Sequence, residues 1–280
     1  MIFRRRGRFT VAAAALTLAL IGTGCAQVTS GTPGAVLSLA GYVQQDAQST
    51  LAQKSVGMRV SGSLTTDGQE VKISGLGQMQ LADYAMKLSM QMTLAGQRVS
   101  MNELLVSGKL FMSLNADGQT MKDLIGKDWA EIDIPGGVQT SSSGVGNPMQ
   151  ILQYAAKNGA KVVSIGSATI RGVETKGYEV TIPRSVFLPD ATAKINADKG
   201  LSPDVRARAL QALQAMTPPV YDVWFDQTHK LLQRMRSQMS MDLGSISFSG
   251  AIVFDFTDYG VKADIQAPPA NDVAPFPGTH

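Results

Sequence analysis

Cysteine, histidine and tryptophan are scarce in this chain. Its 280 residues include one cysteine, two histidines and two tryptophans, and aromatic residues make up 6% of the total. A single cysteine excludes a disulfide within the chain, so burial of apolar surface has to hold the fold together. The histidines, His229 and His280, do not have the spacing of metal ligands, and we expect no metal site. Trp129 and Trp224 alone offer no stacking platform, and we expect no nucleic-acid partner.

Catalytic motifs are missing as well. No serine has glycine both two residues before it and two residues after it, which excludes the nucleophile elbow of hydrolases, and neither a Walker A loop nor GxGxxG occurs. Asp222 and Asp226 share one face of an expected strand with Trp224, where they would form a carboxylate pair. The simpler interpretation, which we adopt, is the solvated edge of a hairpin. We therefore expect a protein that is not an enzyme and that uses no cofactor.

The N-terminal segment has the order of an export signal. Four arginines between residues 4 and 8 precede an apolar run over residues 11–21, which is too short to span a bilayer. The sequence Gly22-Thr23-Gly24-Cys25 resembles the lipobox of bacterial lipoproteins, in which the cysteine is diacylated and becomes the first residue after cleavage. Gly22 departs from that pattern, because Leu, Val or Ile is usual there. We predict lipidation of Cys25; the alternative is an ordinary signal peptide followed by a free cysteine.

Removal of this signal changes the charge balance. It takes away four arginines and no acidic residue, and so leaves 21 lysines and arginines against 22 aspartates and glutamates. A nearly neutral chain has no patch that neutralises phosphates, which again argues against nucleic acid. No apolar run after Cys25 reaches the length of about 18 residues that a membrane span needs.

The body of the chain begins with a helix and continues with strands. Apolar residues recur every three or four positions over 36–51, which predicts an amphipathic helix. Over 57–114 the period is two, and we expect four strands joined by short turns in an antiparallel meander. In the last of these segments Met101 and Leu104 are both apolar, and we expect a change of phase near Asn102.

The second half of the chain mixes strands and helices. Alternating segments predict strands over 129–134, 161–170, 176–183, 221–225, 232–243, 245–256 and 260–265. N-cap residues and prolines predict a short helix from Pro148 to Gly159, a helical turn over 190–197 and a helix from Pro203 to Pro218. A Gly- and Ser-rich loop is expected over 135–147.

These elements predict an α+β fold built on an antiparallel sheet. A sheet of about eight or more strands that is apolar on one side and has only about three helices must curl to cover that side. We therefore expect a strongly curved sheet, a half-barrel, with helices over its concave face. Methionine is frequent at inward positions where strands normally favour Val, Ile and aromatic residues. The residues expected to line this face are Met58, Met79, Met86, Leu88, Met90, Met92, Leu94, Met101, Met112, Met235, Met239 and Met241.

The methionines have two interpretations. Methionine is flexible and polarizable, so it suits a pocket that accepts irregular apolar partners such as acyl chains. It also fills gaps in ordinary protein cores. Composition alone leaves both interpretations open.

Several local signatures resemble those of a known group of proteins. Two local sequences add to this resemblance. They are the run Val220-Tyr221-Asp222-Val223-Trp224-Phe225-Asp226 before a basic strand, and the ending Asp255-Phe256-Thr257-Asp258-Tyr259-Gly260 with Ala267-Pro268-Pro269-Ala270. In these sequences, and in its predicted acylated cysteine, its short tether and its first helix, the chain resembles actinobacterial envelope lipoproteins of the LppX and LprG type. This resemblance covers most of the chain after Cys25. It is one of pattern, without a catalytic motif.

The resemblance implies a fold like that of the lipoprotein carriers LolA and LolB, with a cavity for lipid chains between a curved sheet and its helices. It also implies a protein exported to the outer face of the cell membrane or the periplasmic space, anchored through Cys25, with lipid or glycolipid acyl chains and an envelope transporter as partners. We divide the chain into a signal peptide (1–24), a lipidated cysteine with its tether (25–34), one carrier-like domain (35–266) and a flexible tail (267–280). The alternative is a non-catalytic scaffold lipoprotein with a filled core.

Overall fold

The computed structural model describes residues 38–66, 68–83, 85–94, 96–132, 160–197, 202–215, 220–242 and 247–276. Cys25 with its tether, the loop expected over 135–147 and the helix expected from Pro148 lie outside these residues. Within the described part of the chain, no helix is both long enough and apolar enough to cross a membrane.

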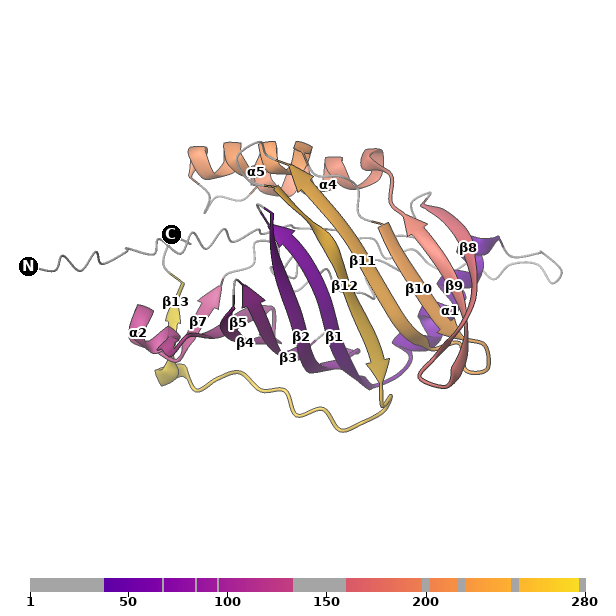
Figure 1. The fold of residues 1–280 in the computed structure, drawn as a ribbon, viewed down its shortest axis with the longest axis horizontal. Helices are drawn as coiled ribbons and strands as arrows, with labels where there is room; N and C mark the ends of the chain where they lie inside the picture. Colours follow the sequence, from indigo (N-terminus) through magenta and orange to yellow (C-terminus); the bar gives the residue numbers. More distant parts are fainter. Residues whose placement is uncertain are drawn as a thin grey trace, which may run out of the picture.

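A sheet of 13 strands forms most of the described structure (Figure 1). The strands of the first half are β1 (Ser55–Thr66), β2 (Gln69–Gln80), β3 (Met86–Leu94), β4 (Gln97–Val106), β5 (Lys109–Ala116), β6 (Gln119–Thr120) and β7 (Trp129–Ile132). Those of the second half are β8 (Lys161–Ile170), β9 (Val173–Thr181), β10 (Val220–Asp226), β11 (Leu232–Asp242), β12 (Ser247–Thr257) and β13 (Val273–Pro275).

The strand order joins the two halves of the chain in the middle of the sheet. It runs β13-β7-β5-β4-β3-β2-β1-β12-β11-β10-β9-β8, with β6 paired to β5 beside this path. The described pairs are antiparallel except for β13 with β7. The expected large antiparallel sheet with few helices is therefore confirmed.

Tight turns fix the register of several hairpins. Asp117-Gly118 joins β5 to β6 and Arg171-Gly172 joins β8 to β9, and all four residues have positive φ, at 49°, 87°, 50° and 82°. Two successive residues with positive φ match the twist of the strands that they connect, and glycine adopts this conformation without steric cost. The alternation of side chains is thus set locally at each hairpin.

Three longer helices pack on one face of the sheet. They are α1 (Leu39–Leu51), α4 (Arg184–Ala197) and α5 (Pro203–Ala215), and they contribute Val43, Leu188 and Leu213 to one hydrophobic cluster with the strands. The hydroxyl of Ser38 accepts a hydrogen bond from the amide of Gly41 at 3.2 Å and so caps α1. α4 is longer than the expected helical turn. In Figure 1, α5 lies next to β11, and α1 lies next to β8.

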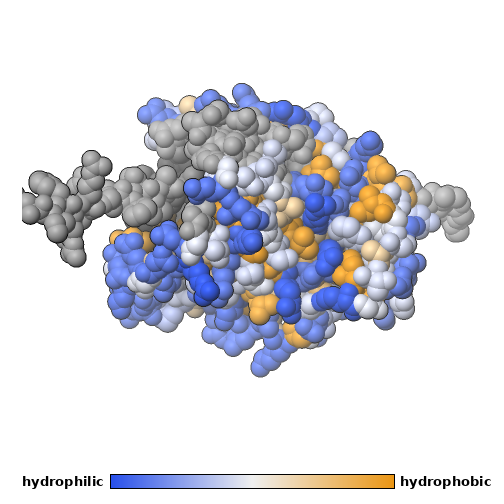
Figure 2. Space-filling model, in the orientation of Figure 1, coloured by the Kyte–Doolittle hydropathy of each residue, from blue (hydrophilic) through white to orange (hydrophobic). Residues whose placement is uncertain are grey.

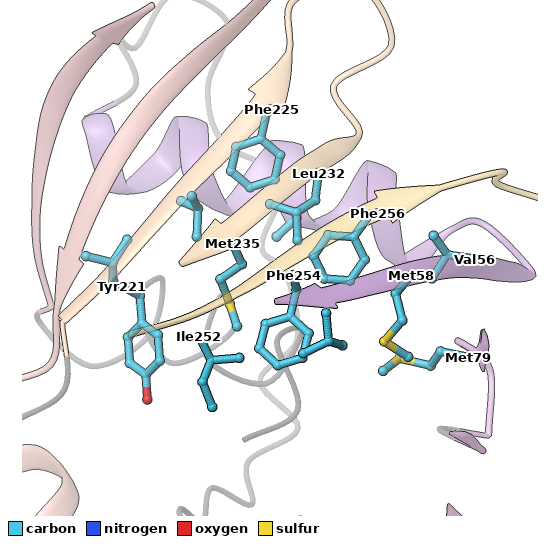
Figure 3. Close-up of a cluster of buried hydrophobic side chains, with 14 of the residues drawn as sticks. Val56, Met58, Met79, Tyr221, Phe225, Leu232, Met235, Ile252, Phe254 and Phe256 are labelled. Atoms are coloured by element: carbon cyan, nitrogen blue, oxygen red, sulfur yellow. The ribbon is translucent and has the colours of Figure 1, made fainter. Parts of the chain in front are cut away.

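The main hydrophobic core lies between this sheet face and the helices. Its largest fully buried side chains include Phe225, Phe256, Leu232 and Met235, each at most 1% exposed. Figure 3 shows these side chains, from β10, β11 and β12, beside Met58 and Met79 of the first strands. On the side of the molecule seen in Figure 2, hydrophobic residues form small patches between polar ones, as on most protein surfaces.

The C-terminal segment covers the opposite face of the sheet. The amide of Gly260 donates to the carbonyl of Ser55 at 2.9 Å, and the Gln80 side chain donates to the carbonyl of Ala263 at 3.0 Å. Ile265 then packs with Leu104 in a second cluster that also contains Ala85 and Phe111. The strand expected over 260–265 is therefore wrong, because these residues bind across the sheet instead of extending it.

The last described residues also differ from the expected flexible tail. A 3-10 helix, η1 (Ala270–Asp272), leads into β13, which pairs in parallel with β7 so that Val273 lies opposite Trp129. A further backbone hydrogen bond joins the amide of Phe276 to the carbonyl of Glu131 at 2.9 Å. The C-terminal segment thus supplies the edge strand at one end of the sheet.

Candidate ligand-binding face

The expected lining residues share one face of the sheet, which we call the methionine face. In an antiparallel sheet, residues directly opposite one another point to the same side. The register pairs Met79 with Met86, Met90 with Met101, and Glu103 with Met112. Across strands β2 to β5, this alternation therefore places methionines from neighbouring strands on the same side, as the sequence indicated.

The expected lining residues differ in burial. Those nearer the centre of the sheet are 1% to 6% exposed: Met58, Met79, Leu88, Met90 and Met235. Four on β3, β4 and β5 are only half-buried: Met86, Met92, Met101 and Met112. Leu94, Met239 and Met241 are placed by their backbone alone, opposite Val71, Gly250 and Phe248. The first three of the half-buried methionines pack against the main core.

Aromatic residues dominate the half of this face formed by β10, β11 and β12. Phe254 and Phe256 alternate on β12 and are 2% and 0% exposed (Figure 3). The rings of Phe225 on β10 and Tyr178 on the neighbouring β9 lie 6.5 Å apart in a tilted arrangement. These strands lie where the sequence predicts them, but the residues predicted to line them are methionines. The alternation of phenylalanine along β12 was the signal that could have located this part of the core.

The two aspartates of β10 are buried, which corrects their expected position on a solvated edge. Asp226 is 3% exposed and its carboxylate accepts hydrogen bonds from the amides of Thr228 and Leu231, at 2.9 Å and 3.3 Å. Asp222 is 6% exposed and lies 3.5 Å from the Arg236 guanidinium. Burial raises the pKa of Asp222, and Arg236 opposes that shift. Asp226 therefore stabilises the turn that follows β10, and Asp222 forms an ion pair with Arg236.

A second ion pair lies on the same outward face of the sheet as these aspartates. Arg234 makes a two-pronged ion pair with Asp255 across β11 and β12, with N–O distances of 2.6 Å and 2.9 Å. Among the described residues, no group of three or more His, Cys, Asp and Glu side chains has the arrangement of a metal site. The polar residues of this region therefore stabilise the sheet.

Glu103 is the polar residue that stands out on the methionine face. It lies directly opposite Leu88 of β3 and Met112 of β5, with Met101 and Leu105 as its neighbours on β4. It is 3% exposed, and its Oε2 atom accepts no hydrogen bond from any residue that the structure describes. Burial raises the pKa of this carboxyl from 4.5 to about 7.

A change of phase near Asn102 would turn Glu103 to the outer face, so the sequence does not predict this buried carboxyl. β4 keeps a regular register with both β3 and β5 from Gln97 to Val106. Leu104 consequently points to the opposite face, where Ile265 covers it. The expectation assumed that all apolar residues share one side, whereas β4 is apolar on both sides and carries its glutamate inward.

Comparisons with known proteins find likenesses of fold. Neither a family model nor a curated protein matches the sequence. Lipoprotein LppX of Mycobacterium tuberculosis is 16% identical, with 81% of this chain and 98% of that chain covered and a TM-score of 0.41. LprF of Mycobacterium bovis is 13% identical, with 82% and 96% covered and a TM-score of 0.42. A putative outer membrane lipoprotein-sorting protein domain of Vibrio parahaemolyticus is 9% identical, with 83% and 94% covered and a TM-score of 0.28.

Proposed function

We propose that this protein is a membrane-anchored envelope lipoprotein that binds the acyl chains of a lipid or glycolipid on its methionine face and carries them within or across the envelope. The observation that carries the proposal is the half-buried state of Met86, Met92, Met101 and Met112 on β3, β4 and β5. These side chains continue the buried apolar face yet keep part of their surface accessible. Apolar area of this kind gains free energy when a hydrocarbon chain covers it.

Chain length rather than specific contacts would supply the affinity. Each methylene group moved from water to an apolar site contributes about 0.8 kcal/mol. A chain of about ten methylene groups on this face therefore has enough binding energy without a polar contact. Methionine suits such a guest, because its flexible side chain adapts to irregular apolar shapes.

The two halves of the face would have different roles. Phe225, Phe256 and Leu232 are at most 1% exposed and pack against the helices, so this half supplies the stability of the fold. The half on β3 to β5 would receive the guest. In this proposal the sheet curves around the guest and the helices lie on its concave side.

The anchor would keep the protein close to its lipid source. We propose that Cys25 is diacylated on the outer face of the cell membrane or in the periplasmic space, since two acyl chains hold a protein stably at a membrane and one does not. The tether over 25–34 would then let the domain exchange its guest with the membrane or with an envelope transporter.

A scaffold lipoprotein with a filled core is the alternative function. It is favoured by the burial of Phe225 on β10 and Phe256 on β12, which are 1% and 0% exposed. In that case the methionines would complete the same packing. Both functions predict a stable domain, so only binding separates them.

The test is binding of diphenylhexatriene, a hydrocarbon probe that fluoresces in apolar surroundings. Met101→Asp places a charge on the methionine face and should reduce binding at least about tenfold, because burying an unpaired charge is costly. Asn102→Asp is the matched control, since Asn102 is exposed on the opposite face of the same strand. Failure of the wild-type domain to bind the probe, or an equal loss in both variants, would exclude the carrier function. Mass spectrometry of organic extracts from the native membrane protein would identify the natural guest.

A further inference from the structure

We infer that Glu103 is the polar contact of the ligand site on the methionine face, and that it selects an amphiphile whose hydrocarbon chain carries a hydrogen-bond donor. This inference deepens the proposed function and depends on it. It names a chemical class of guest where the apolar face alone specifies only hydrocarbon.

The first step is that the sheet fixes the side of Glu103. Its register with Leu88 and Met112 is regular, and no bulge interrupts the described pairs of β4 on either side. A slip by one residue would turn Leu104 away from the second hydrophobic cluster, where Ile265 and Phe111 cover it. The glutamate is thus held on the methionine face by the packing of its own neighbour on the other face.

The second step is that the described protein offers no hydrogen-bond donor to the Oε2 atom of this carboxyl. The residues directly opposite and two positions away on β4 are all apolar: Leu88, Met112, Met101 and Leu105. The peptide groups around it belong to the sheet ladders, and none of the described side chains donates a hydrogen bond to its Oε2 atom. No described residue of β3 or β5 that shares this face with Glu103 is titratable.

The third step is that a buried carboxyl oxygen without a hydrogen-bond donor is unfavourable unless a bound molecule supplies the donor. A buried acceptor without a donor loses its hydration and gains nothing in exchange. Buried polar groups in folded proteins are nearly always hydrogen-bonded, and exceptions point to a strained or functional position. Two of the apolar neighbours of Glu103, Met101 and Met112, are the half-buried residues to which the proposed function assigns the acyl chain.

The chemistry of the missing partner follows from that of the carboxyl group. An oxygen acceptor is satisfied by an O–H or N–H donor, and a guest that lies along the methionines can bring one on its chain or at its head. A hydroxyl group and an ammonium group both meet this requirement. An ether or an unsubstituted hydrocarbon offers no donor to the ionised carboxylate, which is the form that prevails above pH 7.

Three amphiphiles of equal chain length separate these cases: dodecanol, dodecylamine and methyl dodecyl ether. Each is titrated at about pH 8, where the Glu103 carboxyl is ionised and can only accept hydrogen bonds, against wild-type protein loaded with diphenylhexatriene. We expect dodecanol to displace the probe at a concentration about fivefold lower than the concentration that the ether requires. This is the ratio of affinities that one net hydrogen bond provides. A lower concentration for dodecylamine than for dodecanol would identify a cationic donor, and the reverse order a neutral one.

Two variants assign the preference to Glu103. Glu103→Met should abolish the difference between the concentrations at which the alcohol and the ether displace the probe. Glu103→Gln should weaken the alcohol preference, because the amide group can also donate a hydrogen bond to the ether oxygen, and should lose any preference for the amine. Glu70→Met is the matched control, since Glu70 is an exposed strand residue whose carboxylate bonds Ser63 at 2.7 Å.

The outcomes distinguish this inference from the proposed function. If wild-type protein binds diphenylhexatriene but dodecanol and the ether displace it equally, the role of Glu103 is overturned while apolar binding stands. The same conclusion holds if Glu103→Met retains the alcohol preference. If the probe does not bind the wild-type protein, both the proposed function and this inference are overturned. Far-ultraviolet circular dichroism confirms that each variant is folded before it is titrated.

Discussion

Replacing Glu103 by methionine should stabilise the protein, in contrast to most substitutions at buried positions. The carboxyl is 3% exposed, its Oε2 atom has no donor among the described residues, and its neighbours on the face are apolar. Methionine is unbranched like glutamate, so Glu103→Met removes the polar atoms with little change in shape. Substituting a buried, uncompensated polar group by an apolar one of similar volume is neutral or stabilising.

The magnitude depends on pH in a defined direction. Burial raises the pKa of Glu103 from 4.5 to about 7, so between these values the folded state binds a proton that the unfolded state has lost. Stability then falls as pH rises, because the slope follows the protons bound by the unfolded state minus those bound by the folded state. Below pH 4.5 the carboxyl is protonated in both states, and the gain from Glu103→Met should be about 1 to 3 kcal/mol. Above pH 7 the gain should be larger by about 3 kcal/mol.

Urea unfolding at a series of pH values measures this difference directly. The free energy of unfolding of wild type and variant should diverge as pH rises from about 4 to about 8, with equal m-values. Glu70→Met, which removes an exposed carboxylate from another strand, is the matched control for the loss of a carboxyl group. A difference between Glu103→Met and wild type that is the same at both ends of the pH range would refute the reasoning, as would destabilisation throughout.

Three further predictions concern other parts of the fold. Burial raises the pKa of Asp46 in α1 to about 6, so wild-type stability should fall as pH rises from about 4 to about 6, and urea unfolding of Asp46→Asn should show a weaker pH dependence. Ile265→Ala should cost about 2 to 5 kcal/mol in the same assay, because Ile265 covers Leu104 on the second cluster; a cost below about 0.5 kcal/mol would show that the C-terminal segment does not bind there. Gly177→Ala should cost about 1 to 3 kcal/mol and shift tryptophan fluorescence, since a Cβ atom would lie 2.6 Å from Nε1 of Trp224; unchanged stability and fluorescence would contradict that close packing.

The strands were predictable because their alternation and turns are encoded locally. The alternation over 84–95 and the turn at Gly96 define β3 and its connection without knowledge of the rest of the chain. The pairing of β1 with β12 is different, since it joins residues about two hundred positions apart, such as Met58 and Phe256. Periodicity predicts each of these strands but not which strand lies beside it.

Two physical causes account for the errors: cover from a distant segment, and hydrogen bonds from a turn that is adjacent in sequence. β4 carries apolar residues on both faces because Ile265 covers its outer side. The local sequence pattern of β4 does not predict that a segment so distant in sequence packs there. The burial of Asp226 on β10 has a local cause, because its carboxylate accepts hydrogen bonds from the amides of Thr228 and Leu231 in the turn that follows. A polar residue on an alternating strand was read as exposed, whereas its partners come from the adjacent turn.

Stability and binding measured on the same variant decide what Glu103 does. Natural proteins are not optimised for stability, so a stabilising substitution by itself shows only that the glutamate is tolerated. A gain in stability combined with loss of the preference for dodecanol over its ether would mean that the glutamate lowers stability in the empty protein and supplies selectivity in the loaded one. A gain in stability with the preference intact would leave Glu103 without a role in the site and would place the donor preference elsewhere on the methionine face.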